Sequence, residues 1–146
     1  MFELDERLQR DTLALGDFPL CRLLLMNDAR FPWFILVPRR NHVQEIFDLS
    51  GAEQPLLWRE VTSLTQNLYL ALKADKMNVA SLGNLVPQLH VHVVARYRND
   101  PAWPEPVWGT PDPLPYETVQ MQKVSEVLEG FLGTEFDWIT SGRTTK

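Results

Sequence analysis

Two of the chain's three histidines stand in one short stretch, residues 88–94, with the sequence QLHVHVV. Polar and apolar residues alternate there, which predicts a half-buried strand. Because alternate side chains of a strand share a face, we expect Gln88, His90 and His92 to project together while the apolar residues face the core. Neighbours on that face are about 7 Å apart, a spacing that suits side chains gripping different oxygens of one anionic group.

The middle side chain of this set predicts nucleophilic chemistry at phosphorus. A neutral imidazole is a good nucleophile near pH 7, because its pKa of about 6.5 leaves much of it unprotonated. Attack on phosphorus would give a covalent phosphoramidate, while a neighbouring His or Gln donates hydrogen bonds to the non-bridging oxygens. We therefore expect His90 to be the nucleophile and His92 and Gln88 to hold the phosphate oxygens.

A metal site is the alternative use of the histidines. The His-x-His spacing of His90 and His92 suits one metal ion, and His42 is a third candidate ligand. No carboxylate or cysteine clearly completes such a set, so we expect neither a metal nor another cofactor. His42 itself is predicted to be a surface or loop-packing residue.

The composition limits the class of protein. The chain has 146 residues, of which 45% are hydrophobic and 23% charged, values typical of globular proteins. Its net charge of −5 argues against non-specific binding to nucleic acid polymers. No apolar run approaches the roughly 20 residues of a membrane span, and the acidic N-terminus does not resemble a signal peptide. The single cysteine, Cys21, excludes an internal disulfide, so we expect a cytoplasmic protein without a membrane partner.

Five strands and two helices are predicted around the histidine stretch. Besides residues 88–94, we expect strands at residues 12–15, 20–26, 33–37 and 77–82, and their short connections favour an antiparallel sheet. Ser50 and Glu53 form a capping box. Leucine and valine then recur at helical spacing, which predicts an amphipathic helix of about five turns. A second helix is predicted over residues 116–132, which gives an α+β fold.

We expect one domain over residues 1–146, with a core at about 12–98. Residues 99–115 are rich in proline and tryptophan, which predicts an extended loop before the C-terminal helix, and residues 143–146 are expected to be frayed. Trp103 and Trp108 of this loop are expected to dock onto the domain. Packing over a nucleotide base or across a dimer interface is the alternative for both.

The stretch QLHVHVV resembles the signature of the histidine triad (HIT) family, His-apolar-His-apolar-His-apolar-apolar, with Gln at the first position. Residues 25–40 resemble the family's nucleotide-binding hairpin, in which an Asn or Asp at the end of the first strand holds the ribose. The resemblance therefore implies ribose binding by Asn27 or Asp28. Gly83-Asn84 resembles a Gly-Gln pair before the triad, which implies that Asn84 contacts the substrate.

The resemblance implies a fold, an activity and an assembly. The fold would be a small α+β domain with a five-stranded antiparallel sheet and one long helix, usually as a homodimer. The activity would be hydrolysis or transfer at the α-phosphate of a nucleotide conjugate through a nucleotidyl-histidine. A diadenosine tetraphosphate or another dinucleoside polyphosphate, or a nucleoside phosphoramidate, would be the substrate. The chain is similar to bacterial members that combine the Gln variant with a tail like PAWPEPVWG.

Three departures from the family pattern bear on activity. Gln88 replaces the first histidine, so one potential positive charge near the phosphate is lost. Trp33 stands where the family commonly has a fourth histidine, and Leu85 stands where relatives often place a hydroxyl. A nucleotide-binding module with little or no catalysis is therefore the alternative to an enzyme.

Overall fold

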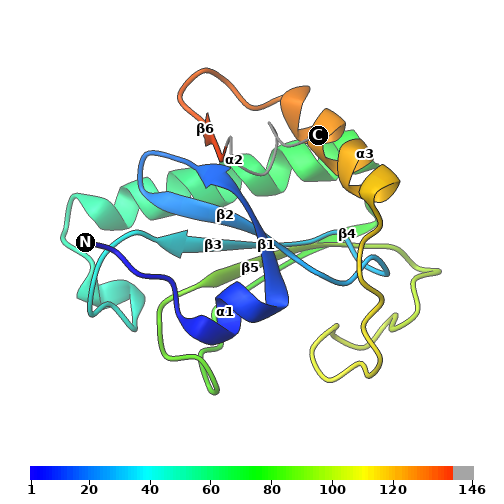
Figure 1. Cartoon of the computed structure of the whole chain (residues 1–146), viewed down its shortest axis with the longest axis horizontal. Helices are drawn as coiled ribbons and strands as arrows, with labels where there is room; N and C mark the ends of the chain where they lie inside the picture. Colours follow the sequence, from blue (N-terminus) through cyan, green and yellow to red (C-terminus); the bar gives the residue numbers. More distant parts are fainter. Residues whose placement is uncertain (140–146) are drawn as a thin grey trace.

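A six-stranded antiparallel sheet forms the centre of the computed structural model, which describes residues 1–139 (Figure 1). The strands lie in the order β4-β5-β3-β2-β1-β6. Their bounds are β1 Thr12–Asp17, β2 Cys21–Met26, β3 Trp33–Pro38, β4 Lys76–Ala80, β5 Val91–Arg96 and β6 Asp137–Trp138. The helices are α1 Glu6–Asp11, α2 Glu53–Leu72 and α3 Thr118–Glu129, with a short 3-10 helix, η1, at Ile46–Asp48.

The predicted α+β fold with an antiparallel sheet and one long helix is confirmed. The prediction of five strands omits β6, which has only two residues and is too short to show an alternating pattern. β6 pairs with Gly16 and Asp17 of β1. A side chain at Gly16 would collide with the Asp137 carbonyl, so the close approach of β6 depends on a glycine there.

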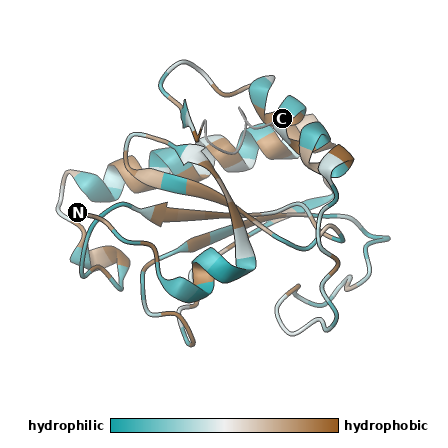
Figure 2. Cartoon of the chain, viewed as in Figure 1, coloured by the Kyte–Doolittle hydropathy of each residue, from teal (hydrophilic) through white to brown (hydrophobic). Residues whose placement is uncertain are grey.

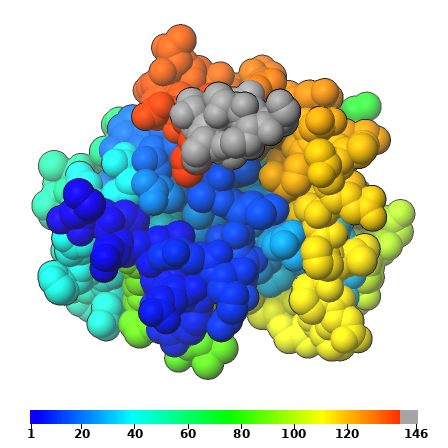
Figure 3. Space-filling model, in the orientation of Figure 1, coloured from blue at the N-terminus to red at the C-terminus, as the bar shows by residue number. Residues whose placement is uncertain are grey.

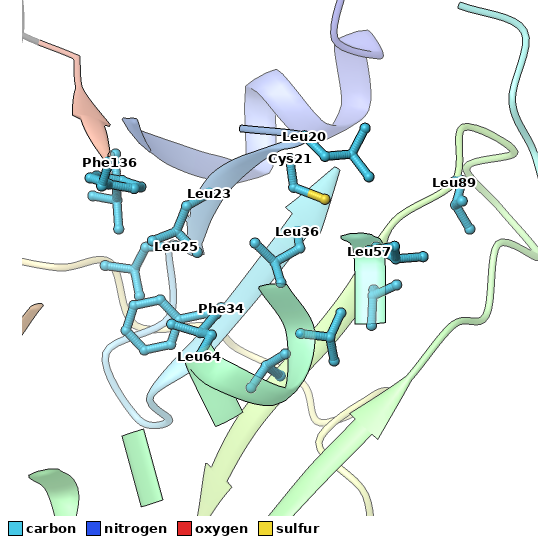
Figure 4. Packing of buried hydrophobic residues seen from close by; sticks show 14 of the residues in the cluster. Leu20, Cys21, Leu23, Leu25, Phe34, Leu36, Leu57, Leu64, Leu89 and Phe136 are labelled. Atoms are coloured by element: carbon cyan, nitrogen blue, oxygen red, sulfur yellow. The ribbon is translucent and has the colours of Figure 1, made fainter. Parts of the chain in front are cut away.

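One face of the sheet is covered by α2, which buries its apolar stripe there (Figure 4). The predicted capping box is confirmed, since Glu53 N–H donates to Ser50 Oγ and Ser50 N–H donates to the Glu53 carboxylate. The stripe on α2 consists of Leu57, Val61, Leu64 and Leu68. Side chains of α3 pack against the same core. This face carries most of the hydrophobic packing and holds the sheet rigidly behind the histidines.

The opposite face is covered by the N-terminal residues with α1 and by the loop before α3 (Figure 3). The chain between β5 and α3 forms turns and bends rather than helices or strands, as its proline content predicts. A second cluster of buried apolar residues lies under this cover, and Figure 2 shows the hydrophobic character of the central strands. It contains Leu8, Leu24, Phe31, Trp33, Ile35, Val37, Val94 and Val107.

The histidine stretch differs from the prediction in two respects. Strand β5 begins at Val91 rather than at Gln88, and all six of its residues are buried rather than half-buried. The physical reason is that both faces of the sheet are covered, so the polar positions of the alternation point into packed protein rather than into solvent.

None of the helices within residues 1–139 combines the length and apolar character required to cross a lipid bilayer. The residues predicted to be frayed, 143–146, lie outside the described part of the chain.

Candidate active site

His90 and His92 lie side by side on the face of the sheet opposite α2. His90 immediately precedes β5 and His92 is its second residue, so the strand geometry directs both rings to the same side. The ring centroids are 5.0 Å apart, with an angle of 68° between the planes. The two residues are only 6% and 5% exposed. The common face that the alternation predicts for these two residues is therefore present.

A main-chain carbonyl fixes the proton of His90. The Nδ1 atom lies 2.7 Å from the carbonyl oxygen of Gln88. A carbonyl oxygen can only accept, so Nδ1 must carry the hydrogen, and in the neutral ring Nε2 then keeps its lone pair. This is the state that a nucleophilic imidazole requires.

Trp33 fixes the proton of His92 on the other ring nitrogen, Nε2. Its indole Nε1 donates a hydrogen bond of 3.0 Å to His92 Nδ1. Ile35 is the β3 residue directly opposite His92, so Trp33 is a diagonal neighbour within reach of a long aromatic side chain. Since an indole N–H can only donate, His92 Nδ1 must accept, and the single proton of the neutral ring lies on Nε2.

The surroundings of His92 keep it neutral. Burial lowers the pKa of His92 to about 3, and the nearby His90 acts in the same direction. The two neutral rings thus present different nitrogens: His90 a bare Nε2 and His92 an Nε2–H donor.

Trp108 completes the enclosure of His92. Its ring makes edge contacts with His92, at 5.1 Å between centroids, and with Trp33, at 6.1 Å. The docking predicted for Trp108 therefore takes place on the histidine site itself. Its Nε1 is buried and has no hydrogen-bond partner within residues 1–139.

A buried ion pair anchors the loop that carries Trp108. Arg96, the last residue of β5, binds both carboxylate oxygens of Asp100 and donates to the carbonyl of Glu105. Its guanidinium also lies over the ring of Trp103. The predicted docking of Trp103 onto the domain thus occurs through Arg96, which fixes the start of the loop at the end of the histidine strand.

The side chain of Gln88 holds the N-terminal segment. Its Oε1 accepts from Asp5 N–H at 2.9 Å, and its Nε2 donates to the carbonyl of Glu3 at 2.9 Å. Arg7 of the same segment donates to the carbonyl of Leu85. Only the second amide hydrogen of Gln88 remains for a phosphate oxygen, so the role of phosphate ligand that the sequence predicts depends on that hydrogen alone.

A cavity of about 360 Å³ lies beside Trp33, between the end of β2 and the loop before α3. Asn27 lines it, and Asn27 Oδ1 accepts from the main-chain N–H of Tyr116. Neither His90 nor His92 is among its lining residues. Trp33 lies between the cavity and the histidines, because it lines the cavity and donates a hydrogen bond to His92. The cavity is lined by Arg10, Asp11, Met26, Asn27, Asp28, Trp33, Val107, Gly109, Thr110 and Pro113.

The two remaining candidates are placed less favourably for binding. The Asp28 carboxylate, 3% exposed, accepts hydrogen bonds from Arg30 and from the main-chain N–H of Leu114. Burial alone would raise the pKa of Asp28, but the Arg30 guanidinium and these N–H groups hold it below its ordinary value. Asn84 is exposed in the loop before β5 and does not line the cavity.

The third histidine lies apart from the other two. His42 is an exposed turn residue with a φ of 61°. Within residues 1–139, no group of three or more His, Cys, Asp or Glu side chains is arranged to hold a metal ion.

Three solved bacterial structures are similar to this chain along nearly its whole length. A histidine triad protein from Marinobacter aquaeolei VT8 is 48% identical, with a TM-score of 0.86, and the match covers 89% of this chain and 95% of that one. A histidine triad protein from Bradyrhizobium japonicum is 44% identical, with a TM-score of 0.86 and coverage of 88% and 96%. A histidine triad (HIT) protein from Sinorhizobium meliloti 1021 is 42% identical, with a TM-score of 0.87 and coverage of 90% and 98%.

The family comparison agrees with these structures. The model of the HIT domain matches residues 7–99, which include the whole sheet except β6, together with α2 and both histidines of the site. A search of curated proteins found no match.

Proposed function

This chain belongs to the HIT domain family, and we propose that it is a nucleotide hydrolase or transferase acting at the α-phosphate of a nucleotide conjugate. The observation that carries the proposal is the contact between His90 Nδ1 and the Gln88 carbonyl, because it leaves Nε2 as the nucleophilic atom. A dinucleoside polyphosphate or a nucleoside phosphoramidate is the substrate class.

The proposed reaction has two displacements at phosphorus. The lone pair of His90 Nε2 attacks the α-phosphorus, a nitrogen–phosphorus bond forms, and the bond to the leaving group breaks with its electron pair. Water or another acceptor then displaces the imidazole and releases the nucleotide. His92 donates through Nε2–H to a non-bridging oxygen, where a neutral donor stabilises the developing charge. Gln88 contributes its second amide hydrogen and holds the N-terminal segment beside His90.

The cavity beside Trp33 is the proposed place of the nucleoside. Of the two predicted ribose ligands we retain Asn27, because the Asp28 carboxylate is already bound by Arg30 and Leu114. The Asn27 amide nitrogen faces no hydrogen-bond partner within residues 1–139 and is suited to a ribose hydroxyl. Asn84, which is exposed in the loop before β5 and lies outside this cavity, is the proposed contact of the leaving group.

His90→Ala tests the nucleophile. We expect turnover of a nucleoside phosphoramidate and of a dinucleoside polyphosphate to fall by several orders of magnitude, as is typical for loss of a nucleophile, while nucleotide binding persists. His42→Asn is the matched control, since asparagine tolerates the positive φ at this exposed turn and should leave turnover unchanged.

The wild-type protein supplies the second half of this test. Denaturation during turnover of a substrate labelled at the α-phosphate should leave the label on His90. If the protein binds nucleotide and His90→Ala turns over as fast as the wild type, the chain is a binding module and the enzyme proposal is wrong.

We also propose a homodimer formed through the free edge of the sheet. β4 is the terminal strand in the sheet order, and within residues 1–139 no strand pairs with its outer side. Trp58, Tyr69 and Val79 are 45%, 46% and 42% exposed around a hollow between α2 and β4. An exposed apolar patch at an open edge favours pairing with a second copy.

Light scattering tests the proposed homodimer. A monomer at micromolar concentration would overturn the proposal, and Val79→Lys should dissociate the dimer.

A further inference from the structure

We propose that Trp33 is a positioning residue, whose indole N–H holds His92 as a neutral donor with its only proton on Nε2. The inference rests on the proposed function for its catalytic meaning and on the hydrogen bond between Trp33 Nε1 and His92 Nδ1 for its structure. It assigns a role to a position where the sequence departs from the family pattern.

The direction of this hydrogen bond follows from the chemistry of the two rings. An indole nitrogen has a hydrogen and no available lone pair, whereas a neutral imidazole has one nitrogen of each kind. If His92 carried a proton on Nδ1, two hydrogens would face each other across 3.0 Å in a buried place. The same clash arises in the neutral tautomer that carries its proton on Nδ1 and in the imidazolium, which carries a proton on both nitrogens.

The indole also fixes the orientation of the His92 ring. A half-turn about the Cβ–Cγ bond would place a carbon where Nδ1 now lies and would leave the Trp33 N–H without an acceptor. Trp33 is only 7% exposed, so its N–H would be left unsatisfied in a buried place, which disfavours the flipped ring. Trp33 therefore specifies which ring atom occupies each position, and with it the place of the Nε2–H donor.

The packing around Trp33 makes it a rigid support. The ring contacts Phe31 edge-on at 6.4 Å and Trp108 edge-on at 6.1 Å between centroids. Trp33 itself is the first residue of β3 and pairs with Val94 of β5, so its main chain is tied to the histidine strand. A donor held in this way keeps its direction while the substrate changes.

Trp108 offers a matched control. Its ring also contacts His92, at 5.1 Å between centroids, but its Nε1 has no hydrogen-bond partner within residues 1–139. Trp33→Phe and Trp108→Phe thus remove the same atoms from two rings against the same histidine. Only the first substitution removes a hydrogen bond to it.

Nitrogen NMR of the imidazole side chains at pH 7, without substrate, is the direct test. We expect His92 Nδ1 to be unprotonated in the wild type and in Trp108→Phe. In Trp33→Phe we expect its resonance to move toward that of a protonated nitrogen, through the second tautomer or the imidazolium. A protonated Nδ1 in the wild type, or an unchanged Nδ1 resonance in a folded Trp33→Phe, would overturn the proposal.

Kinetics then test the catalytic meaning. Loss of a positioned donor should lower kcat of Trp33→Phe by about 10- to 100-fold with little change in KM, somewhat less than complete removal of such a donor. An unchanged kcat together with a protonated Nδ1 would overturn the positioning role. If the wild type turns over no nucleotide, the proposed function fails, while the NMR result still decides how Trp33 holds His92.

Discussion

The two neighbours of His90 in the QLHVHVV stretch are held in contrasting ways. His92, on one side, is buried within the sheet and bound by a side chain of the adjacent strand β3. Gln88, on the other side, is half-buried and bound by the main chain of Glu3 and Asp5, more than 80 residues away in sequence. The first contact sets a protonation state, whereas the second attaches a segment.

This difference explains how an amide can stand at one end of the stretch. A neutral imidazole has one donor and one acceptor whose positions depend on the tautomer, but an amide always offers a carbonyl oxygen and an NH₂ group. Gln88 uses both groups at once on the N-terminal segment. Its carbonyl oxygen accepts from the N–H of Asp5, and its NH₂ group donates to the carbonyl of Glu3. His92 divides its two nitrogens between different partners, since Nδ1 accepts from Trp33 and Nε2–H is left as the donor of the site.

Acid should affect the His92 side of this comparison most strongly. The pKa of His92 is lowered from 6.5 to about 3 in the folded protein, so the unfolded chain takes up a proton at a higher pH than the fold does. The contribution of the neutral ring to the free energy of unfolding is therefore complete above pH 6.5. It should decline by up to about 1.4 kcal/mol per pH unit as the pH falls toward 3.

His92→Gln isolates this effect, since its amide oxygen can still accept from Trp33. Carboxylates with lowered pKa values, such as Asp28 and Asp100, also lose stabilisation as the pH falls, but they do so in both proteins. Urea unfolding should show the stability of the wild type falling relative to the variant between pH 6.5 and pH 4. A constant difference in the free energy of unfolding between the two proteins over that range would mean that His92 takes up its proton as readily in the folded protein as in the unfolded chain.

Much of the fold could be predicted because its signals are local. The capping box at Ser50 and Glu53 and the apolar stripe behind it lie within one helix, so periodicity alone identifies α2. β6 could not be found in this way, because its two residues are specified by the close approach to Gly16.

The site could be predicted only in part, because its partners come from distant segments. The spacing of His90 and His92 places both rings on one face of any strand. The hydrogen bond from Trp33 depends on the register between β3 and β5, and the contact of Trp108 depends on how Arg96 anchors its loop. Alternation also predicted exposure on the polar face, and it could not reveal that the N-terminal segment covers this face.

The smallest effect is expected on the Gln88 side. Gln88→Leu removes both hydrogen bonds to the N-terminal segment, which should lower the free energy of unfolding by about 1–3 kcal/mol. The Asp5 amide should exchange with solvent much faster, because it loses its acceptor. Gln88→His should fold and should change kcat more than affinity, since an imidazole can replace one of the two contacts.

Gln9→Leu is the control for this prediction. Gln9 also donates to the N-terminal segment, at the carbonyl of Leu4, but its removal leaves Asp5 N–H bound to Gln88. Hydrogen exchange at Asp5 should therefore accelerate in Gln88→Leu and stay slow in Gln9→Leu. Equal exchange in both variants would mean that Gln88 does not hold the segment. The amide would then be free to serve as the phosphate ligand that the sequence predicts, and the contrast between the two sides of His90 would disappear.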